Sequence, residues 1–501
     1  MSDNQGTSVA VFAHNSKAHY SGGRYHAFVM ALSLVNAGFK VTFVTDNIPV
    51  VYQDFEGYQE RDNLNIKLVK SFKQKYLSES FDTVILVPGM DGYHNVNIYQ
   101  LAVRQKKKFG SKLILLNFES PNWFNKYSPK PRAEYLWAGW RFVAAHSDVI
   151  LSMTEEAIKY AKTYYDVDDA RHFYCYPAIN DQAVQSLANY SKEKNIICFY
   201  RRVNGAHKGG DVVQDLMIEE MKGYTIKFFC GFDRPEDEEY DNLKAKADLY
   251  SIKIDIISKA SDYRKFFEYK KARLLIFPSQ FEGFGYPPVE ALASGASCVC
   301  YDLPVLKETC GNKLIYAKHG DVDDLRDKIR NFLTGDQGVE KIDTDFVRQH
   351  SIEAVGSKLS LIISDINSKG DDASVKTSVV YYHYLIVSFL FAFYRLMIFV
   401  AKRSNLLVKG RLHRCARLCK RILGKIRNII KCFVRKFCHH TKRFCLITFR
   451  RVCNVIKRFV CKCYRLVIRI VRTLRNIIRP VFRLGFRVLR KSNNVIKNRL
   501  N

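Results

Sequence analysis

The stretch FPSQFEGFGYPPVEALASG, residues 277–295, joins an apolar run to a helical pattern through a turn rich in glycine and proline. The apolar run RLLIFP, which ends at this turn, has the pattern of a buried β-strand. Proline suits the first turn of a helix and glycine commonly follows the last, so the segment from Pro287 to Gly295 predicts a short helix. Two carboxylates frame the turn, because Glu282 lies on the loop after the strand and Glu290 lies in the first helical turn.

This turn suits a ligand that carries both negative charge and hydroxyl groups. Gly283 and Gly285 allow the backbone N–H groups of the loop to approach a ligand closely, and a helix N-terminus favours an anion such as phosphate. Carboxylates accept hydrogen bonds from hydroxyl groups, which a sugar or a ribose supplies. A nucleotide sugar has a diphosphate and several hydroxyl groups, and therefore meets both requirements.

Strand-like runs alternate with helical patterns along most of the chain. Continuous aliphatic runs are typical of strands buried on both faces of a parallel sheet. The first series comprises SVAVFAH, KVTFVT, TVILVP, KLILLNF and DVILSM, and the second comprises NIICFY, YTIKFFCG, IKIDII, RLLIFP, ASCVCY and KLIYA. The sequence therefore predicts an α/β protein with two Rossmann-like domains that face each other across a cleft, at residues 1–185 and 190–367. A closing helix is expected at the end of the second domain.

The segment EGFGYPPVEALASG resembles the signature of the family 4 glycosyltransferases, in which seven residues separate two glutamates. These enzymes use nucleotide sugars, retain the configuration of the transferred sugar and have the GT-B fold. The resemblance covers both predicted domains in layout, although its sharp motifs lie in the second. It implies that Glu282 lies near the hydroxyl groups of the donor sugar and that Glu290 binds the ribose. It also implies that Gly283, Phe284 and Gly285 present the loop backbone to the donor.

A second motif, FYRRVNGAHKGGDVV, follows the first strand of the second domain and agrees with this resemblance. The family has an arginine and a lysine spaced as Arg202 and Lys208 are here, and Arg201 stands where the family usually has glycine. Two such cations that converge after a strand can neutralise a diphosphate and stabilise it as a leaving group. In the first domain, Gly22 and Gly23 resemble the family's glycine loop beside the diphosphate.

Glu119 departs from the family pattern. In several relatives a histidine near the reacting sugar carbon follows the strand that corresponds to KLILLNF, whereas Glu119 follows it here. Three roles stay open for this carboxylate: to orient the acceptor hydroxyl, to stabilise positive charge at the sugar, or to serve the structure alone. The residues expected to carry the catalysis are Glu282, Arg202, Lys208 and Glu119.

No position in the sequence marks a covalent nucleophile, which favours the front-face retaining route, in which the leaving phosphate helps to remove the acceptor's proton. The basic pair and the helix N-terminus supply positive charge, and no pair of aspartates stands at a strand end. We therefore expect no metal site and no cofactor beyond the donor, a UDP- or GDP-sugar, with a glycan or lipid-linked acceptor. Two alternatives stay open: a GT-B sugar phosphorylase or epimerase, against which both motifs argue, and a degenerate transferase that serves as a membrane scaffold.

The net charge of +31 arises at the C-terminal end of the chain. Residues 373–501 hold 33 of the 80 Lys and Arg residues and no Asp or Glu, which leaves 47 basic and 49 acidic residues before them. The sequence therefore predicts a nearly neutral globular body, a linker at residues 368–378, and a basic α-helical extension.

Residues 379–401 form an apolar segment long enough to span a bilayer, interrupted by His383 and Arg395. The N-terminus shows no secretory signal pattern, and nucleotide sugars for such enzymes are cytosolic, so the body is expected inside the cell. The basic tail also belongs on the cytoplasmic side, and a single span cannot keep both ends there. These arguments favour a helix that lies in the interface or dips in and out, while a span stays open.

Apolar residues recur every seven positions within residues 402–501. One row comprises Leu446, Cys453, Val460, Val467, Leu474 and Val481, and a second runs from Phe449 to Leu484. A coiled coil shares this period, but without acidic residues its flanking positions would repel. An amphipathic helix on an anionic membrane explains both the stripe and the charge, whereas nucleic acid explains only the charge and is not expected. The sequence thus predicts a peripheral or monotopic protein at the cytoplasmic side of a membrane.

Overall fold

The computed structural model describes residues 4, 6–15, 21–89, 96–132, 137–165, 167–188, 190–200, 207–210, 212–230, 237–335 and 342–368. The expected apolar segment 379–401 and basic tail 402–501 lie outside these residues, and so does Arg202. Within the described part of the chain, the helices are all too short or too polar to cross a membrane.

The first domain is built on a parallel sheet whose described strands lie in the order β3-β2-β1-β4-β5-β6-β7. Its strands are β1 (Ser8–Ala13), β2 (Lys40–Thr45), β3 (Leu64–Leu68), β4 (Thr83–Leu86), β5 (Lys112–Asn117), β6 (Val149–Ser152) and β7 (His172–Tyr174). Its helices are α1 (Gly22–Asn36), η1 (Val50–Phe55), α2 (Glu56–Gln59), η2 (Lys70–Phe72), α3 (Val96–Phe109), α4 (Pro121–Tyr127), α5 (Ala138–Ala144), α6 (Glu155–Tyr165), η4 (Asp169–Arg171) and α7 (Asp181–Ser186).

The second domain has a parallel sheet with the described order β10-β9-β8-β11-β12-β13. Its strands are β8 (Glu193–Tyr200), β9 (Thr225–Cys230), β10 (Lys253–Ser258), β11 (Ala272–Phe277), β12 (Ser297–Tyr301) and β13 (Ile315–Ala317). Its helices are η6 (Val213–Leu216), η7 (Glu219–Met221), α8 (Asp237–Leu249), α9 (Asp262–Lys271), α10 (Tyr286–Ala293), α11 (Pro304–Cys310), η8 (Gly311–Lys313), α12 (Val322–Thr334) and α13 (Thr344–Gln349), and α14 (Ile352–Ser368) follows.

Both sheets reverse their strand order in the middle, which is the arrangement of a doubly wound fold. The reversal lies between β1 and β4 in the first sheet and between β8 and β11 in the second. Ligands of such sheets bind beyond the carboxyl ends of the strands at these points. The prediction of an α/β chain with two Rossmann-like domains is confirmed. A ligand is expected at the loops that follow β1 and β4 in the first sheet and β8 and β11 in the second.

The central strands form where the sequence predicts them, because they are buried on both faces. Every residue of β4 and β6 is buried, and β1 is buried from its second residue onward. Strands β3 and β7, the outermost of the first sheet, were not predicted from the sequence. Both are short and partly exposed, so they lack the continuous apolar run that marks a central strand.

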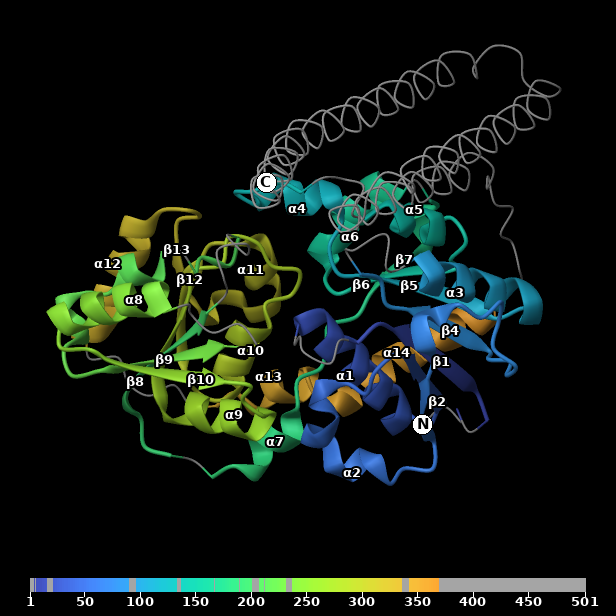
Figure 1. Ribbon diagram of the computed structural model, residues 1–501, viewed down its shortest axis with the longest axis horizontal. Coiled ribbons are helices and arrows are strands. Elements are labelled where there is room, and N and C mark those ends of the chain that lie inside the picture. Colours follow the sequence, from blue (N-terminus) through green and yellow to red (C-terminus); the bar gives the residue numbers. More distant parts are fainter. Residues whose placement is uncertain are drawn as a thin grey trace, which may run out of the picture. The chain divides into compact units, whose positions relative to one another are not determined.

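Helices cover both faces of the first sheet (Figure 1). Residues of α1 and α14 share one hydrophobic cluster, and residues of α3, α5 and α6 belong to another on the opposite face. The closing helix α14 was expected at the end of the second domain, but its apolar face packs against α1 of the first. Gly356 allows this close approach, since a Cβ there would lie 2.3 Å from the carbonyl oxygen of Ser33 in α1.

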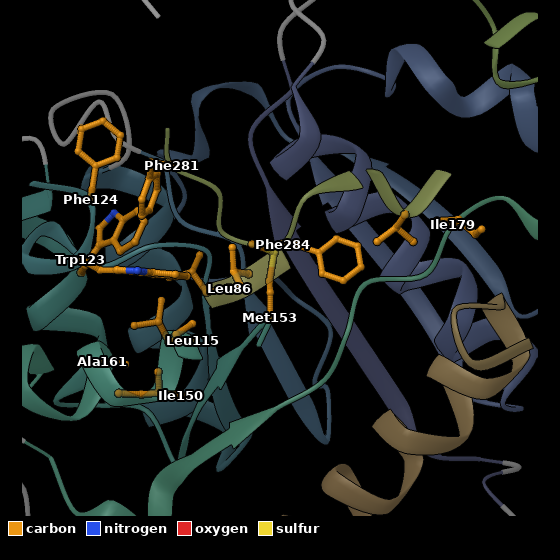
Figure 2. Packing of buried hydrophobic residues seen from close by; sticks show 14 of the residues in the cluster. Leu86, Leu115, Trp123, Phe124, Ile150, Met153, Ala161, Ile179, Phe281 and Phe284 are labelled. Atoms are coloured by element: carbon orange, nitrogen blue, oxygen red, sulfur yellow. The ribbon is translucent and has the colours of Figure 1, made fainter. Parts of the chain in front are cut away.

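Apolar side chains of the loop after β11 pack against the first domain (Figure 2). The Phe281 ring meets the rings of Trp123 and Phe124 edge-on, with centroids 5.1 Å apart in both pairs. Phe284 and Met153 belong to the same buried cluster. The loop that carries the predicted site is therefore held by both domains.

Candidate active site

The loop after β11 needs its glycines for close packing as well as for any ligand. Gly285 has φ +94° as the residue before α10, and a Cβ there would lie 2.4 Å from Cδ2 of Leu306. A Cβ at Gly283 would lie 2.5 Å from the carbonyl oxygen of Phe118, which follows β5 of the first domain. Gly283 thus lets the loop pack directly against the end of a first-domain strand, and Gly285 lets it pack against α11 of its own domain.

Lys208 and Glu282 form an ion pair, with Nζ 2.7 Å from Oε1. The carbonyl of His207 accepts hydrogen bonds from the backbone N–H of Gln280 and the hydroxyl of Ser279, at 2.7 and 3.2 Å. These bonds tie the end of the loop after β8 to the loop after β11. The structure therefore brings together two predicted site residues that lie far apart in sequence, while Arg202, the third member of the predicted set, lies outside the described residues.

Glu119 lies after β5, on the first-domain side of this ion pair. Burial raises the pKa of its carboxyl to about 7; Lys208 and Arg132 act to lower this pKa, and Glu282 acts to raise it further. Oxygen Oε1 is buried and has no hydrogen-bond partner among the described residues. Its electrostatic coupling to Lys208 and Glu282 joins the three into one charged group drawn from both domains.

Gly22 and Gly23 form the first turn of α1, which Ser21 caps by accepting a hydrogen bond from the backbone N–H of Arg24. A Cβ at Gly22 would lie 3.7 Å from the Tyr286 ring, and one at Gly23 would lie 3.3 Å from the Phe118 ring. The glycine turn therefore lies between Phe118 of the first domain and the start of α10 in the second, where the N-terminus of α1 can add N–H donors for an anion.

His26 lies one helical turn after these glycines, and the sequence analysis assigned it no role. Its ring meets the Phe118 ring edge-on at 6.0 Å, and complete burial lowers its pKa to about 3, so the imidazole is neutral. The spacing of three and four residues from Gly23 and Gly22 places His26 on the same helix face as these glycines.

Glu290 has different partners from Glu282. Its Oε1 lies 2.6 Å from Nζ of Lys265, which also lies 2.9 Å from Oδ1 of Asp262, and all three side chains are buried. Burial raises the pKa of Glu290 to about 7; Lys265 acts to lower this pKa and Asp262 to raise it. The two glutamates of the motif are thus each paired with a lysine of their own. The sequence analysis missed Lys265 and Asp262, because α9 carries no motif of its own.

A small, open pocket lies beside Glu282, between α4 and α6 of the first domain and the loops and start of α11 in the second. Its walls are formed by Trp123, Tyr127, Glu156, Phe281, Glu282, Leu303, Pro304 and Val305. Trp137 and Trp140 are buried in the same hydrophobic cluster as Trp123 but do not line this pocket. Among the residues that the structure describes, no group of three or more His, Cys, Asp or Glu side chains is arranged to hold a metal ion.

Two curated bacterial proteins match a short part of the chain. They are the O-antigen chain mannosyltransferase RfbU of Salmonella typhimurium (strain LT2), 40% identical over 63 residues, and the O-antigen chain mannosyltransferase B of Escherichia coli, 37% identical over 68 residues. These matches cover 13% and 14% of this chain and 18% of each relative's length.

Solved structures resemble the chain over much more of its length. Sucrose-phosphate synthase from Thermosynechococcus elongatus matches with a TM-score of 0.56 and 12% identity, over 72% of this chain and 99% of its own. Anabaena HepE, in complex with UDP and glucose, matches with a TM-score of 0.52 and 11% identity, over 71% and 99% of the two chains. At such low identity these likenesses show the fold. The chain has the GT-B fold, and its residues 184–346 match the family model described as glycosyl transferases group 1.

Proposed function

We propose that the protein is a retaining glycosyltransferase that moves a sugar from a nucleotide-diphosphate-sugar to a glycan or lipid-linked acceptor. The observation that carries the proposal is the Lys208–Glu282 ion pair with the Glu119 carboxylate beside it, at the carboxyl ends of β5, β8 and β11. The group 1 region and the mannosyltransferase relatives support glycosyl transfer, and the UDP and glucose bound by the Anabaena protein support a nucleotide-sugar donor.

The ion pair suits both halves of such a donor. An arriving diphosphate attracts the Lys208 ammonium, which is about one-quarter exposed, and Glu282 then becomes available to accept hydrogen bonds from the sugar hydroxyls. Arg202, six residues before Lys208, and the N-terminus of α1 add positive charge for the leaving group. We infer that these cations make a metal ion unnecessary, so that excess EDTA would leave the rate of transfer unchanged.

In the proposed reaction, the bond from the sugar's anomeric carbon to the diphosphate oxygen breaks, and a bond to the acceptor oxygen forms on the same face. The acceptor's proton passes to the leaving phosphate oxygen. Ionised Glu119 stabilises the positive charge that develops at the sugar in between. In this front-face route the leaving phosphate removes the acceptor's proton, so the reaction requires no covalent nucleophile.

The test is the release of nucleotide from UDP-, GDP-, ADP- and dTDP-sugars by the full chain, with Glu282→Gln as the control. Release from one donor, lost in the control, supports the proposal and identifies that donor, and the anomeric configuration of a transferred product tests retention. A folded protein that neither cleaves nor binds any member of the panel would instead favour a degenerate membrane scaffold.

We further propose that residues 379–501 hold the protein at the cytoplasmic face of an anionic membrane. The support is the sequence alone: 33 basic residues without an acidic one after residue 372, with an apolar residue every seven positions. Flotation with phosphatidylserine-containing vesicles tests this, with neutral vesicles as the control. Retention on RNA in place of anionic vesicles would overturn it.

A further inference from the structure

Tyr25 of the first domain reaches into the second. It belongs to α1, follows the Gly22–Gly23 turn and is 1% exposed. Its hydroxyl donates a hydrogen bond to Oδ2 of Asp262 at 2.7 Å, and its ring meets the Tyr286 ring edge-on at 5.3 Å. Asp262 and Tyr286 are the first residues of α9 and α10, so one side chain of the first domain contacts the starts of both helices.

A buried chain of polar contacts leads from Tyr25 to Glu290. Asp262 accepts the tyrosine hydroxyl through Oδ2 and contacts Lys265 through Oδ1, and Lys265 contacts Glu290. The ammonium of Lys265 also lies 5.2 Å from the centre of the Tyr25 ring, within range of a cation–π interaction. The lysine is therefore held by two carboxylates and an aromatic ring, with contributions from both domains.

The buried cluster around Lys265 contains more carboxyl groups than ammonium groups. Lys265 and Asp262 of α9 act directly on the charge of Glu290. Asp54 of η1 interacts electrostatically with these two residues, and Tyr25 of α1 contacts both of them. Burial and the Asp262 charge raise the pKa of Asp54 to about 7, as they do for Glu290, and Lys265 opposes this rise at both carboxyls. Removal of the lysine would leave Glu290 buried next to like charge, where the neutral acid is favoured.

We propose that Lys265 and Tyr25 are positioning residues for Glu290: Lys265 keeps its carboxylate ionised and oriented toward the ribose of the donor, and Tyr25 makes that arrangement depend on contact between the two domains. This inference rests on the nucleotide-sugar function proposed above. A neutral Glu290 is a poorer acceptor for ribose hydroxyls, so loss of either positioning residue should weaken nucleotide binding more than it slows the chemical step.

The first experiment titrates UDP and GDP into the full-length protein by calorimetry, from pH 6 to pH 9. Wild-type affinity should fall as the pH drops through about 7, because Glu290 takes up a proton there. Lys265→Met should weaken nucleotide binding about tenfold or more at pH 7 and shift the fall in affinity to higher pH. Lys265→Arg keeps the positive charge and should retain much of the wild-type affinity. The matched control is Lys227→Met, which removes a buried ion pair with Glu268 in the same domain and should leave the affinity unchanged.

The second experiment uses a substitution that should affect the stability of the fold less. Tyr25→Phe removes one hydroxyl and keeps the ring, and should weaken binding about tenfold, since hydrogen bonds to buried charges are among the stronger ones. Its control is Tyr99→Phe, which removes a buried hydroxyl bonded to the carbonyl of Gly89 within the first domain.

The outcomes separate this inference from the proposed function. Wild-type protein that binds neither UDP nor GDP, nor any other member of the donor panel above, would overturn both. Wild-type binding that Tyr25→Phe and Lys265→Met leave unchanged or tighten would overturn the positioning role alone, and tighter binding would mean that the contact competes with the nucleotide. A Lys265→Met variant that weakens binding equally at every pH would also overturn it, since a merely structural loss does not move the pH profile.

Discussion

The carboxylate of Glu308, in α11 of the second domain, accepts a hydrogen bond from the backbone N–H of Glu155, 2.6 Å away in the first turn of α6 in the first domain. Its second oxygen accepts from the N–H of Glu156 at 2.8 Å, and the hydroxyl of Tyr176 donates to Oε1 at 3.1 Å. A side chain of one domain thus caps a helix of the other. Together with the Tyr25–Asp262 bond, it gives the domains two polar contacts made by different helices.

Removal of this cap should destabilise the contact between the domains. Glu308→Ala leaves two N–H groups at the start of α6 without their acceptor, which should lower the free energy of unfolding by about 1–2 kcal/mol. Glu308→Gln keeps one acceptor oxygen and should cost less. Urea unfolding measures whether Glu308→Ala loses more stability than Glu308→Gln. The control is Asp302→Ala, because Asp302 pairs with Lys307 on the surface and this pair should contribute less than about 1 kcal/mol. Equal loss in the Glu308 and Asp302 variants would contradict the capping role.

The Lys208–Glu282 pair should be required for transfer rather than for folding. Glu282→Gln and Lys208→Met should each lower kcat/KM about 10²- to 10³-fold, because each removes a group that acts on the reacting donor. Initial rates with the donor found in the panel measure this effect. Lys318→Met, which removes an exposed lysine of the same domain, should leave the rate unchanged, and a comparable loss in that variant would point to a general effect of charge.

Glu119 should impose a pH dependence on the chemical step. Burial raises the pKa of this carboxyl to about 7, so the ionised form is lost as the pH falls through that value. We therefore expect kcat to fall below pH 7 in the wild type, and to be lower and independent of pH in this range in Glu119→Gln. Single-turnover rates at saturating donor separate this effect from the pH dependence of binding at Glu290. An unchanged profile in Glu119→Gln would restrict Glu119 to a structural role.

Gly283 should resist substitution for a steric reason. A Cβ there meets the Phe118 carbonyl oxygen at 2.5 Å, and Gly283 has no positive φ that would add backbone strain. Gly283→Ala should therefore cost about 1–3 kcal/mol of stability as an overpacked contact and displace Glu282, which lowers activity. Thermal unfolding and initial rates test this. The control is Gly57→Ala, where a Cβ meets nothing within 4 Å and no positive φ occurs.

Much of the fold could be predicted because buried strands require continuous apolar runs. The run RLLIFP became β11, and the helix expected from the prolines after it became α10, with Gly295 just past its end at φ +70°. The edge strands β3 and β7 could not be predicted in this way. Half-exposed strands carry mixed side chains, and their pairing depends on a neighbour that is distant in sequence.

The sequence predicted those residues of the candidate site that belong to a recognisable motif. Glu282 and Lys208 were singled out by spacing, and they meet in the structure. Lys265, Tyr25 and Glu308 were not predicted, because each lies in a helix without a motif. The role of each depends on a contact with a residue of another element.

The sequence by itself determined the order of the strands with continuous apolar runs, the places where glycine and proline interrupt the elements, and which loops follow the strands at the centres of the two sheets. These features follow from the backbone preferences of individual residues and from burial, which appears in the sequence as a run of neighbouring apolar residues. Only the tertiary structure decided that Glu282 pairs with Lys208 and Glu290 with Lys265, and that α14 returns to the first domain. Those relationships depend on packing between elements far apart along the chain, and the charge of each buried carboxylate depends on which cation that packing brings to it.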